Sequence, residues 1–356
     1  MVEHMSKHAL IVGATGITGS NLAQHLLAEG GWSVSGLSRS VSPIVGVETL
    51  KCDLVDPDSV RGALVGLRPS HVFITAWSRQ ETEVENCRVN GAIVRNVLDG
   101  LQGGSVEHVA LTTGTKHYLG PFESYAKTQP ETPFREEQDR LPGENFYYVQ
   151  EDEVFTAAAR DGFTWSIHRP HTLIGYAVGN AMNMAATLAV YASICRETGR
   201  PFIFPGSPQQ WQAATDVTDA RLLARHLQWA ATTKAAANLA FNVVNGEVFR
   251  WKWLWPRIAA YFDIEAAAYP GVLNPLESQM ADAEAIWDEM VRKYGLQPNA
   301  LSRVASFWHS DADLGRPVET FNDMGRSRKL GFMEYQDTTQ SFTDAFDRLR
   351  ADRIIP

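Results

Sequence analysis

The chain has 356 residues, of which 44% are hydrophobic and 21% charged, and this composition is typical of a globular protein. Its formal net charge is −9 and no stretch is rich in Lys and Arg, so we expect neither a nucleic-acid partner nor an anionic membrane partner. The longest apolar stretch, Met182–Cys195, is too short to span a bilayer, and Met1–Lys7 lacks the apolar core of a signal peptide, so we expect a cytoplasmic protein.

The first third of the chain alternates short apolar runs with amphipathic helical patterns. The expected strands and helices, in chain order, are His8–Val12, Asn21–Glu29 (helix), Trp32–Leu37, Asp56–Leu67 (helix), His71–Ala76, Glu83–Leu101 (helix) and Val106–Thr112. Repeated strand–helix units of this length predict an α/β fold with a doubly wound parallel sheet of the Rossmann type.

The alternation weakens after Thr113. Gly120–Gly143 is rich in Pro, Glu and Gln and predicts a surface loop; a helix over Phe146–Arg160 and a strand over Thr164–Arg169 follow. Beyond residue 175, helices mix with two short predicted strands, Pro201–Phe204 and Ala240–Val244. We therefore expect a Rossmann domain over residues 1–175 and a smaller substrate-binding lobe over 176–356, with some segments at about 200–245 returning to the sheet.

A glycine-rich loop, GATGITG, directly follows the first predicted strand and opens a helix. Glycine allows the tight turn and lets the backbone approach a pyrophosphate, whose charge is favoured at a helix N-terminus. The position inside a strand–helix–strand unit is the context that this motif requires. We predict a dinucleotide site that includes Gly13, Thr15, Gly16, Ile17, Thr18 and Gly19. The GxxGxxG spacing resembles that of extended short-chain dehydrogenases.

The end of the second strand distinguishes the two nicotinamide cofactors. An acidic residue there would favour NAD, but the chain has Ser38, Arg39 and Ser40, which can bind the 2′-phosphate of NADPH. NADPH/NADP+ is therefore the expected cofactor, the alternative being that Arg39 is a solvated surface charge. Asp53 and Leu54 end the next strand, where the related dehydrogenases place such a pair against the adenine.

The usual Tyr-x-x-x-Lys motif of short-chain dehydrogenases is absent, since none of the ten tyrosines has a lysine four residues later. Either the protein is not a catalyst of the usual kind or the lysine comes from elsewhere. Two segments stand out, TTGTKHYLGPFESY at Thr112–Tyr125 and NFYYVQEDEVF at Asn145–Phe155. Together with TWSIHRP, AFNVVNGEVFRWKWLWP and the closing LGF, they resemble the progesterone 5β-reductase/iridoid synthase-like (PRISE) enone reductases. The resemblance runs from the glycine loop to Pro356.

That resemblance implies Lys116 and Tyr147 as the catalytic pair, with Tyr148 as the alternative phenol. The implied reaction is NADPH-dependent 1,4-reduction of an enone or enal, including steroid 4-en-3-ones. Hydride goes to the β-carbon, Tyr147 stabilises the enolate oxygen, and Lys116 adds a positive field or holds the tyrosine. The alternatives are a surface lysine and packing tyrosines. The adjacent pair Glu151 and Asp152 we take as structural or solvated.

The resemblance also implies further contacts. Additional cofactor-binding residues are Thr75, Ala76, Trp77, Thr113, Pro170 and Leu173, besides Tyr147 itself. Expected substrate-facing residues are Trp77, Phe122, Tyr148, Met182, Trp308 and His309. The chain departs from the family where His171 and Thr172 replace an expected Gly-Asn, and where His309 replaces an aromatic residue. The last change indicates a different substrate.

Other readings stay open at this stage. A carbonyl reductase or a nucleotide-sugar epimerase would use the same scaffold, and a non-catalytic NADP-binding regulator would need no Lys–Tyr pair. The displaced lysine disfavours the epimerase. We expect no metal site, reduced thiols at Cys52, Cys87 and Cys195, and packing roles for the WKWLWP segment. A small-molecule enone or enal is the expected partner, and a homodimer stays open.

Overall fold

The computed structural model describes residues 7–39, 44–101, 104–121, 124 and 130–356. Its centre is a seven-stranded parallel sheet with the strand order β3-β2-β1-β4-β5-β6-β9. The strands are β1 (Lys7–Val12), β2 (Trp32–Ser38), β3 (Val47–Lys51), β4 (His71–Ile74), β5 (His108–Thr112), β6 (Thr164–Pro170) and β9 (Leu239–Val243). The order reverses between β1 and β4, so the predicted doubly wound Rossmann sheet is confirmed.

Helices cover both faces of this sheet. They are α1 (Ile17–Glu29), α2 (Pro57–Leu64), α3 (Glu83–Gly100), α5 (Phe146–Asp161) and α8 (Ala220–Thr232). Side chains alternate across β1: Leu10 and Val12 pack with α2, α3 and α5, whereas Ala9 and Ile11 pack with α1 and α8. These four side chains are fully buried, which is why Ala9–Val12 is a continuously apolar run.

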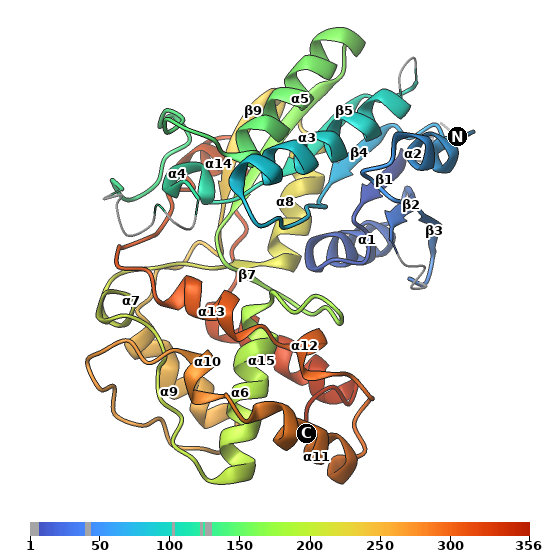
Figure 1. Cartoon of the computed structure of the whole chain (residues 1–356). Helices are drawn as coiled ribbons and strands as arrows, with labels where there is room; N and C mark the ends of the chain where they lie inside the picture. The colour runs from blue at the N-terminus through green and yellow to red at the C-terminus, as the bar shows by residue number, and fades with distance from the viewer. Residues whose placement is uncertain (1–6, 40–43, 102–103, 122–123, 125–129) are drawn as a thin grey trace.

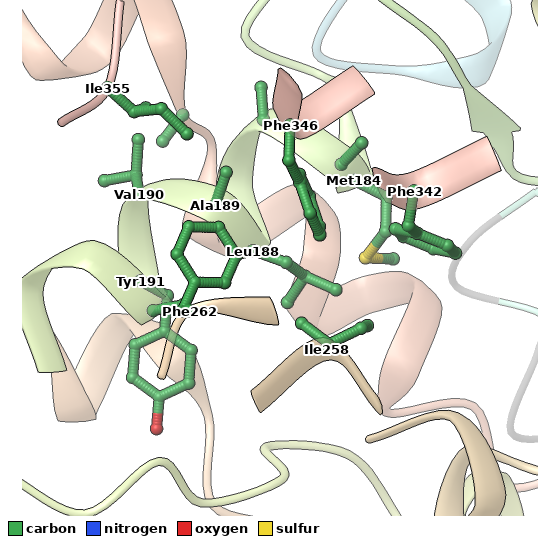
Figure 2. Packing of buried hydrophobic residues seen from close by; sticks show 14 of the residues in the cluster. Met184, Leu188, Ala189, Val190, Tyr191, Ile258, Phe262, Phe342, Phe346 and Ile355 are labelled. Atoms are coloured by element: carbon green, nitrogen blue, oxygen red, sulfur yellow. The ribbon is translucent and has the colours of Figure 1, made fainter. Parts of the chain in front are cut away.

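A helical lobe adjoins the carboxyl edge of the sheet (Figure 1). Its elements, with the short ones that join it to the sheet, are α4 (Lys116–Leu119), β7 (Leu173–Ile174), α6 (Met184–Thr198), α7 (Pro208–Gln212), β8 (Thr218–Asp219), a 3-10 turn at Lys234–Ala236, α9 (Trp251–Tyr261), α10 (Leu276–Gln279), α11 (Ala283–Tyr294), α12 (Leu301–Val304), α13 (Phe307–Leu314), α14 (Gly325–Lys329) and α15 (Thr338–Ala351). Helix α6 is buried along most of its length and forms the centre of the lobe's core with α9 and α15 (Figure 2).

The segment at 200–245 divides between the two parts. β9 and α8 belong to the sheet and its covering layer, while Phe202 and Phe204 lie in the core of the lobe. The strand predicted over Pro201–Phe204 is wrong: only an isolated bridge joins Phe202 to Ala266. The aromatic rings account for this difference, since Phe202 stacks on Trp255 at 4.2 Å and the run is buried among helices rather than beside a strand.

Two other predictions concern packing. Trp251 and Trp255 of the WKWLWP segment are buried, so its predicted packing role is confirmed for these two side chains, while Trp253 is 37% exposed. The loop predicted over Gly120–Gly143 does not lie wholly on the surface. Phe134 is fully buried, and its ring stacks on Tyr118 with centroids 4.8 Å apart, because an aromatic side chain gains more from burial than from exposure.

Within the ranges that the structure describes, no helix combines the length and the apolar run needed to cross a membrane. All three cysteines are free thiols, as expected; Cys52 and Cys195 are buried and Cys87 is half-buried.

Candidate active site

A cavity of about 870 Å³ lies along the carboxyl ends of the sheet strands. It passes the point between β1 and β4 where the strand order reverses, which is where open α/β sheets bind ligands. Residues 179–182 and helix α13 of the lobe form its other side. The cavity therefore joins the glycine loop to residues of the lobe.

The glycine loop has the geometry that a phosphate site requires. Gly13 has φ +90°, and a Cβ there would lie 2.9 Å from the Cβ of Ala76, so only glycine fits. Gly16 caps α1, whose N-terminus faces the cavity. Gly19 does not line the cavity, contrary to its predicted contact with the cofactor. Its Cβ would lie 2.2 Å from the carbonyl oxygen of Gly13, so this glycine lets α1 pack against the loop.

Most of the other predicted cofactor residues lie together around the cavity. Those on its lining are Gly13, Thr15, Gly16, Ile17, Thr18, Ser38, Arg39, Asp53, Leu54, Thr75, Ala76, Trp77, Thr113, Tyr147, Pro170 and Leu173. Arg39 is exposed at the end of β2, and Ser40 lies outside the described residues.

Lys116 is buried and ion-paired. Its Nζ lies 2.6 Å from Oε2 of Glu83 and 4.4 Å from the centroid of the Phe146 ring. The other oxygen of Glu83 accepts a hydrogen bond of 2.8 Å from the backbone N–H of Phe146, at the first turn of α5. One carboxylate therefore holds the predicted lysine and the start of the helix that carries the predicted tyrosine.

Asn145 connects the same two elements. Its side chain caps α5 by accepting a hydrogen bond from the N–H of Tyr147 and donates one of 3.0 Å to the carbonyl of Lys116. The sequence reasoning missed both Glu83 and Asn145. An Asn immediately before a predicted helix is a capping signal that could have identified the second. Glu83, the first residue of an ordinary helical pattern, carried no such signal.

Tyr147 lines the cavity, and its phenol is surrounded by protein on the far side. A Cβ at Gly114 would lie 3.1 Å from the phenol oxygen and 3.3 Å from the carbonyl oxygen of Pro170, so glycine gives the ring its room. Burial, together with the negative charges of Glu83 and Asp313, raises the pKa of Tyr147 well above its usual range. The phenol is therefore protonated at neutral pH and is able to donate a hydrogen bond.

Tyr148 does not face the cavity, so its predicted substrate contact, and its place as the alternative phenol, are wrong. Its hydroxyl donates a 2.6 Å hydrogen bond to the carbonyl of His117 and accepts one of 2.9 Å from the N–H of Leu141. Successive helix residues point about 100° apart, and here this rotation turns Tyr147 towards the cavity and Tyr148 towards His117 and Leu141.

Glu151, four residues after Tyr147, has a structural role. It is 2% exposed and accepts hydrogen bonds from Arg140 and Arg169. Burial opposes its ionisation, but the nearby His117 ring and the two guanidinium groups outweigh burial and lower the pKa of Glu151 to about 2. A carboxylate of this kind cannot serve as a general acid at neutral pH.

Met182, Trp308 and His309 line the part of the cavity that lies against the lobe. Trp77 lines the cavity from the segment after β4, and its ring stacks on Phe146 with centroids 5.6 Å apart. Phe122 lies outside the described residues. The cavity also includes side chains that the sequence reasoning did not single out, among them Arg79, Asp313 and Arg316. Across the part of the chain that the structure describes, no three His, Cys, Asp or Glu side chains are placed to hold a metal ion.

Comparison with known proteins gives consistent relatives. A family model described as a PRISE-like Rossmann-fold domain matches residues 68–356. The 3-oxo-Δ4,5-steroid 5β-reductase of Arabidopsis thaliana is 39% identical, covering 98% of this chain and 93% of the relative. The (S)-8-oxocitronellyl enol synthase of Antirrhinum majus is also 39% identical, over 98% and 92%.

Comparison with solved structures shows the same fold in other proteins. An epimerase from Methanothermobacter thermautotrophicus superposes with a TM-score of 0.70 at 17% identity, covering 98% of this chain and 94% of that one. A UDP-glucose 4-epimerase from Thermotoga maritima gives 0.68 at 12%, over 97% and 99%. At such identities the likeness concerns the Rossmann architecture alone.

Proposed function

The chain belongs to the PRISE-like Rossmann-fold family, and on that premise we propose that it is an NADPH-dependent reductase of α,β-unsaturated carbonyl compounds. The reaction is the 1,4-reduction of an enone or enal, in which one hydride and one proton add across the C=C bond and give the saturated carbonyl compound. The observation that carries the proposal is the position of Tyr147 and Lys116 on the same cavity as the glycine loop.

The cavity fits a dinucleotide phosphate. Gly13 and Gly16 line the cavity beside the N-terminus of α1, where a pyrophosphate would bind, and a Cβ at Gly13 would push this loop away from Ala76. Arg39 extends from the end of β2 at the opening of the cavity, where it would bind a 2′-phosphate with Ser38 and disfavour a cofactor that lacks this group. When bound, the reduced nicotinamide supplies the hydride.

Tyr147 would donate a hydrogen bond to the substrate carbonyl oxygen. Negative charge develops on that oxygen as the β-carbon is reduced, and a donor already in place stabilises it without reorganisation. The raised pKa of Tyr147 suits this role, because the phenol keeps its proton until the enolate has formed. The Phe146 ring lies 4.4 Å from that of Tyr147, centroid to centroid, and stacks on Trp77, so apolar surface lines this end of the cavity.

Lys116 would act on the electrostatics of the site. Its ammonium offsets the charge of Glu83, which otherwise would oppose negative charge on the substrate. It is also tied through its carbonyl to Asn145 and so to the backbone that carries Tyr147. In this proposal the two side chains would together do the work of a Tyr–Lys dyad, although 31 residues separate them in sequence (147 minus 116).

The test is NADPH oxidation with 2-cyclohexen-1-one, comparing the wild type with Tyr147→Phe and identifying the product by mass and NMR. We expect saturated ketone from the wild type and a rate loss of about 100-fold or more in Tyr147→Phe, since one oxyanion donor is typically worth this much. Tyr148→Phe is the matched control, because it removes the neighbouring phenol, which does not reach the cavity.

Three results would contradict the proposal or its assignment of Tyr147. An allylic alcohol as product would assign the enzyme to carbonyl reduction. Tight binding of NADPH without turnover of any enone or carbonyl compound would favour the non-catalytic regulator. Equal losses in Tyr147→Phe and Tyr148→Phe would remove the assigned role of Tyr147.

A further inference from the structure

One face of helix α13 lines the cavity with polar groups that the proposed reaction does not use. This face carries two pairs of residues that are one helical turn apart, Trp308 with Ala312 and His309 with Asp313. Asp313 is close enough to Tyr147 for its charge to raise the pKa of that phenol. The polar face therefore lies at the reacting end of the cavity rather than at its adenine end.

Asp313 has one carboxylate oxygen engaged and one available. Oδ2 accepts a hydrogen bond of 2.7 Å from the hydroxyl of Thr172. Oδ1 lies 3.8 Å from Nη1 of Arg316, beyond hydrogen-bond distance, and the side chain is 14% exposed. Burial opposes ionisation, but the charge of Arg316 outweighs it and lowers the pKa of Asp313, so the group is an anionic acceptor.

A buried network keeps Arg316 from closing onto Asp313. Nη1 of Arg316 donates to Nε2 of His171 at 2.8 Å, so the proton of that ring is on Nδ1, which donates to Asp216 at 2.7 Å. Asp216 also accepts from the backbone N–H of Asn322. The side chains of Arg316, His171 and Asp216 are nearly inaccessible, so the guanidinium is held in place by the buried His171–Asp216 pair.

His309 adds an unpartnered polar atom to the same wall. Its Nδ1 is inaccessible and makes no hydrogen bond with any residue that the structure describes. Burial lowers the pKa of the ring, so His309 is neutral at pH 7 and can both donate and accept. A buried polar atom without a partner costs free energy, and a ligand that repositions this ring could recover it.

We propose that this polar wall, formed by Thr172, His309, Asp313 and Arg316, binds a neutral hydroxyl group of the substrate beside the reacting carbons. A hydroxyl can donate to Oδ1 of Asp313 and accept from His309 or Arg316, so it satisfies both kinds of group at once. A carboxylate would be repelled by Asp313, and a hydrocarbon would leave the acceptor unpaired. Hydroxylated enones and enals are therefore the preferred class, an inference that rests on the proposed C=C reduction.

The experiment compares kcat/KM for pairs of enals of equal chain length, one with a hydroxyl on the γ-, δ- or ε-carbon and the other without it. We expect the hydroxylated member of at least one pair to be preferred by about 10-fold to 100-fold, the range typical of hydrogen bonds to charged groups. Asp313→Asn and, separately, His309→Phe should bring this ratio towards one. Because the ratio is taken within each variant, a general loss of activity cancels.

Asp311→Asn is the matched control. Asp311 lies on the same helix but accepts hydrogen bonds from the backbone N–H groups of Leu276 and Glu277 outside the cavity, so the ratio should stay at the wild-type value. A wild-type ratio of one or less for every pair overturns the proposal, as does a ratio that both cavity variants leave unchanged. If no enal of either kind is reduced at its C=C bond, the proposed function fails first, and the deoxy substrates reveal that separately.

Discussion

The Nζ of Lys116 and the Oε2 of Glu83 are 2.6 Å apart, and both side chains are largely buried beside the candidate cavity. The predicted catalytic lysine is therefore not an isolated cation. Glu83 compensates its charge, and the same carboxylate is one of the two that raise the pKa of Tyr147. The pair thus couples the acidity of the phenol to a residue on α3.

Glu83→Gln tests this coupling through the pH dependence of kcat/KM. The substitution keeps the shape of the side chain but removes a negative charge that raises the pKa of Tyr147, so the phenol should lose its proton at a lower pH. We expect the alkaline fall in kcat/KM to move to lower pH than in the wild type. Glu85→Gln is the control, since Glu85 pairs with Arg88 on the surface of the same helix. An alkaline limb that moves equally in both variants, or not at all, would refute the coupling.

Arg39→Glu tests the choice of cofactor. A carboxylate at the end of β2 would repel the 2′-phosphate and accept a hydrogen bond from a 2′-hydroxyl. The ratio of kcat/KM for NADPH to that for NADH should fall by about 100-fold or more, because a favourable charged contact is replaced by a repulsive one. Arg68→Glu is the control: it makes the same charge change at an exposed residue just before β4, at the amino edge of the sheet, whereas Arg39 lies at the carboxyl edge. An equal change in the two variants would mean a general field rather than a contact.

Gly19→Ala should weaken cofactor binding although Gly19 does not line the cavity. The new Cβ would meet the carbonyl oxygen of Gly13 and displace the phosphate loop, at a typical cost for overpacking of about 1–3 kcal/mol in stability. Gly62→Ala in α2 is the matched control, because nothing lies near its Cβ; alanine there should stabilise the helix by roughly 0.5–1 kcal/mol. Chemical denaturation and NADPH titration measure the two effects. A Gly19→Ala protein with wild-type affinity for NADPH would disprove the packing role.

A chain of buried hydrogen bonds predicts sensitivity to acid. His108 and His168 are bridged by the hydroxyl of Ser166 at 2.9 Å each, and His168 contacts His226 at 3.0 Å. Burial lowers the pKa of His108 and that of His226 to about 3. Below pH 6.5 these histidines are protonated in the unfolded chain, whereas in the folded protein the buried rings stay neutral. The free energy of unfolding should therefore fall between pH 6.5 and about 3, by up to roughly 1.4 kcal/mol per pH unit for each such histidine.

Urea denaturation across that pH range measures this loss in the wild type and in His226→Asn, which removes one of the non-titrating rings. The variant should be less stable at pH 7 but lose less stability as the pH falls. His25→Asn, a half-buried position on α1, should keep the wild-type pH dependence. A slope that is the same in His226→Asn and in the wild type would show that this ring is protonated in the folded protein.

Local sequence patterns were sufficient for the Rossmann sheet and for many of the residues that line the candidate cavity. Alternating apolar runs and amphipathic stretches predict the strands and helices because a residue's position along the period sets which face it occupies. The glycine loop could also be predicted from the sequence, because the positive φ at Gly13 favours glycine. The motifs around Lys116 and Tyr147 identified the family, and both side chains lie on the same cavity.

Other features depended on contacts between elements far apart in the sequence. The family motif favoured Tyr147 over Tyr148 but left both open, and the orientation of α5 over the sheet places the first phenol in the cavity and the second against His117. Glu83 lies 33 residues from Lys116, and no local rule states which carboxylate will meet a buried ammonium.

What the sequence determined by itself is therefore the architecture, the glycine loop and the family, all of which follow from short-range periodicity and contiguous motifs. What only the tertiary structure decided is the electrostatic surroundings of the site: the carboxylate that compensates Lys116, the face of α13 that brings Asp313 to the cavity, and the network that restrains Arg316. The physical reason is that burial and pairing of charges depend on distances across the packed molecule, and the direction of each pKa shift follows from those distances rather than from residue order.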